Sequence, residues 1–116
     1  MSEDLYVELD QQRKLHIGIK EAKALSRVCG VGLVKVIDKL NEFDIETLEK
    51  VLWAATSGDD PSVTLQLTAK RVDTYFQREK TLRPLFVAAA KAIDQSGMFD
   101  QPKEATVGNE TAATVA

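Results

Sequence analysis

Apolar and polar residues alternate at the start of the chain. The apolar positions on the two sides of the polar stretch 10–14 are Leu5, Val7, Leu9, Leu15, Ile17 and Ile19. Because successive side chains of a strand point to opposite faces, this pattern predicts two half-buried antiparallel strands over 5–19. His16 lies between two apolar positions, and we expect it to point to solvent. An isolated hairpin is marginal in water, so its apolar face must pack on the rest of the chain.

From Lys20 to Gly97 the apolar spacing changes to that of helices and predicts about five short ones. The helices are expected to be separated by a glycine turn at Gly30 and Gly32 and by a loop at 57–62. N-caps are expected at Asp44, Thr64 and Thr81, and Pro84 is expected in the first turn of the last helix. The stripes expected in the core of the last three helices are Ile45, Leu48, Leu52 and Ala55; Leu65, Ala69, Val72 and Phe76; and Leu82, Leu85, Phe86, Ala89 and Ile93.

The pattern therefore predicts a mainly α (α+β) fold, with an N-terminal β-hairpin followed by a small helical bundle. We expect one compact domain over 1–99, made of the hairpin 5–19 and the helical part 20–97. Residues 100–116 are polar and small, with Val107 and Val115 as the only branched aliphatic residues, and are expected to be a disordered tail. The length of 116 residues fits a single domain.

Composition narrows the possible functions. The net charge of −3 argues against a general nucleic-acid binder. No apolar run approaches the roughly 20 residues that span a bilayer, and the acidic start 1–4 is unlike a secretory signal. The single cysteine, Cys29, cannot form an internal disulfide and is expected to be a small buried residue. These features indicate a cytosolic protein.

Known signatures of catalysis are missing from the sequence. It contains no nucleophile motif, no phosphate-binding loop and no metal-ligand set, and His16 is the only histidine. The paired carboxylates Asp59 and Asp60 precede a proline and are typical of a turn. We therefore expect a protein that is not an enzyme, has no cofactor and acts by binding other proteins.

Charge is distributed unevenly along the chain. Residues 1–62 carry 8 Lys/Arg and 12 Asp/Glu, whereas residues 63–91 carry 6 and 2. This asymmetry is typical of solvated helix faces, but it could also form a basic surface for an acidic partner or a second copy. The candidate partner-binding residues on the second interpretation are Arg71, Arg78, Lys80 and Arg83. Trp53 is a further candidate, because it could either close the edge of the core or anchor a partner.

The order of the elements, and above all the segment LEKVLWAATSGDDPSVTL at 48–65, resembles the small tail assembly chaperones of long-tailed phages. The resemblance includes especially the relatives encoded in gene transfer agents, some of which are labelled tail tube proteins. The resemblance covers about residues 5–97. It implies a cytoplasmic factor that coats the tape measure protein, keeps it soluble and recruits tail tube subunits, without entering the mature particle. A translational frameshift near the stop can append a tube-binding domain in this family.

Two other functions stay open at this point. One is a structural tail or tail tube component of a phage or gene transfer agent, although a tube protein normally needs a larger sheet than one hairpin. The other is a small helical regulator that binds DNA through residues 64–77. Lys70 and Arg71 are the only basic residues of that segment, and the acidity of the whole chain counts against this function.

Overall fold

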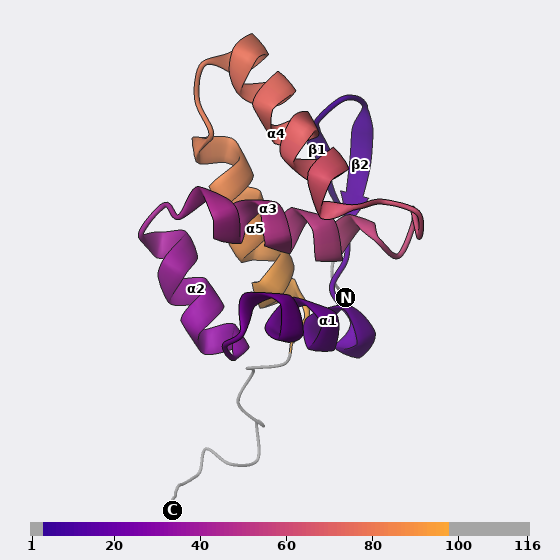
Figure 1. Cartoon of the computed structure of the whole chain (residues 1–116), viewed down its shortest axis with the longest axis vertical. Helices are drawn as coiled ribbons and strands as arrows, with labels where there is room; N and C mark the ends of the chain where they lie inside the picture. The colour runs from indigo at the N-terminus through magenta and orange to yellow at the C-terminus, as the bar shows by residue number, and fades with distance from the viewer. Residues whose placement is uncertain (1–3, 98–116) are drawn as a thin grey trace, which may run out of the picture.

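The computed structural model describes residues 4–97. Within this range the chain forms a two-stranded antiparallel hairpin followed by five helices (Figure 1). The elements are β1 (Leu5–Glu8), β2 (Gln12–Leu15), α1 (Ile19–Cys29), α2 (Leu33–Asn41), α3 (Ile45–Thr56), α4 (Leu65–Glu79) and α5 (Arg83–Gln95). The predicted mainly α class with an N-terminal hairpin is confirmed. The tail predicted at 100–116 lies outside the described residues.

The hairpin is shorter than its apolar alternation suggested. Its turn is closed by a hydrogen bond from Leu9 N to Gln11 O (3.0 Å), so β2 already begins at Gln12, inside the stretch expected to be loop. Beyond β2, the amide of His16 donates to the carbonyl of Ala55 in α3 (3.0 Å), which ties the hairpin to that helix. The side chain of His16 is exposed, as predicted. Ile19 was wrongly placed in the second strand: it begins α1 and is 69% exposed.

Helix ends follow the capping residues at most predicted positions. Gly30 ends α1 in the left-handed conformation (φ 73°), which a residue with a Cβ adopts at a cost. The hydroxyl of Thr64 accepts a hydrogen bond from the amide of Leu67 (3.0 Å) and caps α4. The cap predicted at Thr81 is displaced by one residue, because Leu82 occupies the N-cap of α5.

The helix α3 lies at the centre of the domain. It packs against α1, α2, α4, α5 and β2, and crosses the middle of the view in Figure 1. Its buried residues are Thr47, Leu48, Val51, Leu52, Ala54, Ala55 and Thr56. The hydroxyl of Thr56 donates to the carbonyl of Leu52 (2.8 Å), and that of Thr47 to the carboxylate of Asp44 at the N-cap. The two polar side chains are therefore buried without loss of hydrogen bonding.

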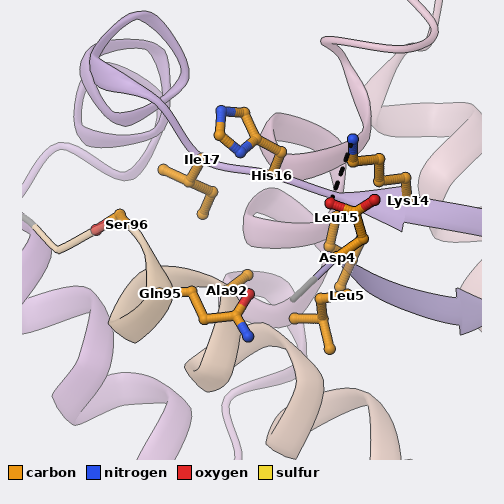
Figure 2. Close-up of a pocket in the computed structure, with 9 residues that line it drawn as sticks. All are labelled: Asp4, Leu5, Lys14, Leu15, His16, Ile17, Ala92, Gln95 and Ser96. Carbon is orange, nitrogen blue, oxygen red and sulfur yellow. Dashed lines mark ion pairs between the residues drawn. The ribbon is translucent and has the colours of Figure 1, made fainter. Parts of the chain in front are cut away.

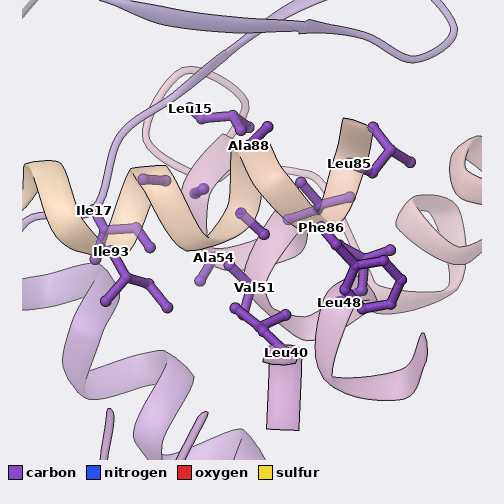
Figure 3. Close-up of a cluster of buried hydrophobic side chains, with 14 of the residues drawn as sticks. Leu15, Ile17, Leu40, Leu48, Val51, Ala54, Leu85, Phe86, Ala88 and Ile93 are labelled. Atoms are coloured by element: carbon purple, nitrogen blue, oxygen red, sulfur yellow. The ribbon is translucent and has the colours of Figure 1, made fainter. Parts of the chain in front are cut away.

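The helix α5 completes the core beside α3. Figure 3 shows side chains of α5, α3, α2 and the hairpin segment converging on one apolar cluster. Leu85, Phe86, Ala89 and Ile93 of the predicted stripe are buried, and Leu82 is partly buried against them. The ring of Phe86 also meets that of Phe43 edge-on, with centroids 5.2 Å apart. No helix within 4–97 is long and apolar enough to cross a membrane.

Two residues expected in the core lie at the surface instead. Ile45 is 50% exposed and Phe76 is 44% exposed. The buried residues of α4 are Thr68, Arg71, Val72 and Tyr75. The helix is thus rotated so that only Val72 of the predicted stripe is fully covered. The reason is that the side chain of Arg71 points inward to the carboxylates of Asp10 and Asp60. In this rotation of α4, Phe76 lies at the edge of the domain.

Truncation of Phe86 tests this packing. Phe86→Ala should lower the free energy of unfolding by about 3–5 kcal/mol, because it leaves a cavity between α5 and α3 and removes the contact with Phe43. Urea denaturation followed by circular dichroism measures the change. A loss below about 1 kcal/mol would show that the ring does not fill the core.

Candidate functional site

Arg71, a candidate partner-binding residue, lies inside the protein. Its side chain is 8% exposed and extends between two loops, with Nη2 3.5 Å from Oδ2 of Asp60 and Nε 3.6 Å from Oδ2 of Asp10. Arg13 of β2 faces the same carboxylates, at 2.7 Å from Asp10 and 3.9 Å from Asp60. We call these four residues the ion cluster. It joins the hairpin turn, the α3–α4 loop and α4.

The cluster is held together by charge. The hydrogen bond from Arg13, with further help from the charge of Arg71, lowers the pKa of Asp10 to about 2. The pKa of Asp60 is also lowered, first by a hydrogen bond from the hydroxyl of Ser62 and then by Arg71. Both carboxylates therefore stay ionised at neutral pH, which suits a guanidinium removed from water.

The expectation that Arg71 contributes to an exposed basic surface is therefore wrong. Its Nε and Nη1 atoms have no hydrogen-bond partner within 4–97, so the guanidinium is satisfied mainly by its ion pairs. Hydropathy could not reveal this, because the neutralising carboxylates come from the hairpin turn and from the loop before α4, outside the helix itself.

Arg78 also makes contacts within the protein that attach α4 to the hairpin. Its guanidinium donates to the backbone carbonyls of Leu9 (Nη1, 2.9 Å) and Glu8 (Nη2, 2.9 Å), and it lies 5.2 Å from the ring centroid of Tyr75. Arg71 and Arg78, seven residues apart, do share one face of α4. That face is turned to the hairpin, and this use of both side chains was not foreseen from sequence.

The other two basic candidates remain accessible. Lys80 is exposed and ends α4 in the left-handed conformation (φ 64°). The guanidinium of Arg83 lies 5.5 Å from the ring centroid of Phe43, which is itself 52% exposed. A binding role for these two cations stays a prediction.

Trp53 lies on the edge of the core. It is partly buried against the apolar cluster, and its Nε1 donates to the carbonyl of Val63 in the α3–α4 loop (3.3 Å). Because the polar group of the indole is used internally, this geometry favours the core interpretation over that of a partner anchor.

An apolar groove runs between α3, α4 and the start of α5. It encloses about 230 Å³ and is lined by Ile45, Glu49, Val72, Asp73, Phe76 and Leu82. We call it the α3–α4 groove. Its two exposed apolar walls, Ile45 and Phe76, are the residues whose burial was wrongly predicted. The apolar periodicity of the sequence marked these residues, but as core.

The groove contains carboxylates that lack cations. Burial raises the pKa of Glu49 above its ordinary value, and the neighbouring charge of Glu46 raises it further. Within the described range, Glu46, Glu49 and Asp73 take part in no ion pair. The groove therefore combines an apolar floor with uncompensated negative charge.

Two residues before Ile45, Phe43 has an unusual backbone. Its φ of 61° is left-handed, which is uncommon for a bulky residue and costs roughly 1–2 kcal/mol. The conformation holds the exposed ring between Phe86 and Arg83. No residue pattern in the sequence signalled it.

A second hollow, of about 300 Å³, lies between the hairpin and the end of α5 (Figure 2). It contains His16 and the exposed ion pair of Lys14 Nζ with Asp4 Oδ1 (3.7 Å). No group of three or more His, Cys, Asp or Glu side chains within 4–97 is arranged to hold a metal. Cys29 is partly buried, and burial raises the pKa of its thiol. These features leave the α3–α4 groove as the stronger candidate.

Acid titration tests the ion cluster. Since the pKa of Asp10 is below its ordinary 3.8, its ion pairs contribute fully above about pH 4 and are lost as pH falls toward 2. Asp10 is 40% exposed, so solvent screening reduces this contribution to about 1 kcal/mol. Between pH 5 and pH 2 the free energy of unfolding should fall in both proteins. The fall should be about 1 kcal/mol larger in the unmodified protein than in Asp10→Asn, which lacks the carboxylate. Equal slopes for both proteins would contradict it.

Comparison with known proteins did not extend this description. No family model matches the chain, and no curated protein or solved structure gives a significant match.

Proposed function

We propose that the chain is a non-enzymatic tail assembly chaperone of a long-tailed phage or gene transfer agent. It binds the tape measure protein and helps to recruit tail tube subunits during tail morphogenesis. The proposal starts from the resemblance of segment 48–65. In the fold this segment spans most of α3, the loop of the ion cluster and the start of α4. It therefore contributes Glu49 to the groove, and its loop leads into α4, which carries the opposite wall.

The observation that carries the proposal is the unpartnered α3–α4 groove. Ile45 and Phe76 expose large apolar side chains beside each other in one hollow, where a residue of the core would be covered. A concave apolar surface of this kind is typical of protein-binding sites. A factor that keeps a long, partly apolar protein soluble needs such a surface.

A chaperone of this kind acts in the host cytoplasm and leaves before the particle is mature. Lys80 and Arg83 follow the groove at the α4–α5 turn and could contact an acidic segment of the tube subunit. Neither the chaperone role nor this contact needs a cofactor or a catalytic residue.

The DNA-binding alternative is weakened by one specific contact. Of the two basic residues in 64–77, Arg71 is buried in the ion cluster and cannot reach a phosphate backbone. The structural alternative is a tail or tail tube component. Such a component would stay in the finished particle, whereas the chaperone would not.

Co-expression tests the proposal. The full chain should raise the soluble fraction of the very long tape measure protein encoded near it, and both should elute together in gel filtration. Phe76→Ser should reduce this effect, whereas Ile19→Ser should not, because Ile19 is an exposed apolar residue of α1 outside the groove. Mass spectrometry of purified particles should find the chain absent. An insoluble tape measure protein, or the chain present in stoichiometric amount in particles, would contradict the chaperone role.

A further inference from the structure

We propose that the α3–α4 groove binds an amphipathic helix of a partner protein whose apolar stripe is flanked by lysine or arginine. The inference deepens the proposed function by stating the chemistry of the partner segment. It also reverses the sign of the expectation from sequence, in which a basic surface met an acidic partner.

The first argument is the size of the groove. At about 230 Å³ it is smaller than the roughly 300–1,000 Å³ typical of small-molecule sites. It suits one or two anchoring side chains of a larger partner. Val72 is buried at its base, while Ile45 and Phe76 expose their side chains on α3 and α4. Large aliphatic side chains one helical turn apart would cover both exposed walls.

The second argument is the form of the groove. It lies between two packed helices and ends at Leu82, where the chain turns into α5. Docking of an amphipathic helix into an apolar groove is a recurring mode of recognition, in which the apolar positions i, i+3 or i+4 and i+7 of the helix enter the groove. Ordering a preformed helical face costs less than ordering an irregular segment.

The third argument is charge complementarity. Glu49 and Asp73 line the groove from α3 and α4, and Glu46 lies one turn before Glu49. None of the three is paired with a cation inside the described range. Burial raises the pKa of Glu49, and the neighbouring charge of Glu46 raises it further. Lysine or arginine beside the apolar stripe of the partner would neutralise these carboxylates.

The same charge argues against two other occupants. The segment 98–116 of this chain has three acidic residues and one lysine, so it would be repelled by the groove. A second copy also carries a net charge of −3. A basic segment of another protein is therefore the occupant that fits.

Peptide binding to the full chain tests the inference. The probe is a fluorescein-labelled amphipathic peptide of about 18 residues, five helical turns, with a leucine stripe flanked by lysines. The matched peptide has glutamate in place of every lysine. Fluorescence anisotropy should show the lysine peptide binding at least about tenfold more tightly, with weakening at high salt.

Variants assign the binding to the groove. Phe76→Ser should weaken the lysine peptide about tenfold or more, with the thermal midpoint nearly kept because the ring is 44% exposed. The double variant Glu49→Lys/Asp73→Lys should lose the lysine peptide and gain the glutamate peptide. Ile19→Ser is the matched control at an exposed apolar site and should leave binding unchanged.

Several outcomes would overturn the inference. These are equal affinity for both peptides, equal losses in Phe76→Ser and Ile19→Ser, or a dimer in sedimentation that Phe76→Ser dissociates. The last would make a second copy the occupant. Lysine-peptide binding without any effect on the tape measure protein would contradict the proposed function alone. Tape measure binding that Phe76→Ser leaves intact would contradict the groove alone.

Discussion

The burial of Arg71 fixes how α4 sits on the rest of the domain. Its guanidinium lies between Asp10 of the hairpin turn and Asp60 of the α3–α4 loop, and Arg13 bridges the same two carboxylates. A buried cation is costly unless it is paired, so α4 is stable only in the rotation that brings Arg71 to both loops. Arg78 strengthens that rotation by bonding to the backbone of the hairpin. The hairpin, which is far from α4 in the sequence, is thereby held in one arrangement with α4 and the loop that precedes it.

This rotation has a consequence for the surface. The face of α4 that carries Arg71 and Tyr75 is used against the domain, so Phe76 is left at the edge. On α3, Ile45 lies before the residues that α5 covers, and it stays exposed as well. Apolar residues that could have extended the core instead line a groove with acidic residues between them. Stability and the proposed binding thus draw on neighbouring faces of the same helix.

The central helix α3 connects these two roles. Its inner residues are packed against most of the other elements, whereas its first turn and Glu49 contribute to the groove. Its C-terminal end accepts the amide of His16 and leads into the loop that carries Asp60. A change in the packing of α3 would therefore alter the geometry of both the ion cluster and the groove. The groove is supported by a rigid element, as a binding site requires.

The amino-acid sequence alone determined the element types and most of their limits. Period-two alternation marked the hairpin, the helical period marked the five helices, and Gly30 and Thr64 marked two of the ends. These features are local, because they depend on the spacing of a few neighbouring residues. The predicted burial of Phe86 held for the same reason, since its stripe is regular and is matched by α3.

Only the tertiary structure decided which face of α4 is buried, and hence where the candidate site lies. By hydropathy Arg71 is a surface residue and Phe76 a core residue, and the structure reverses both. The energy of a buried charge depends on whether opposite charges lie within a few ångströms. For Arg71 those charges come from Asp10 and Asp60, 61 and 11 residues away in the sequence. No local pattern reports such a distance, so only the tertiary structure could decide that Ile45 and Phe76 stay exposed beside Glu49 and Asp73.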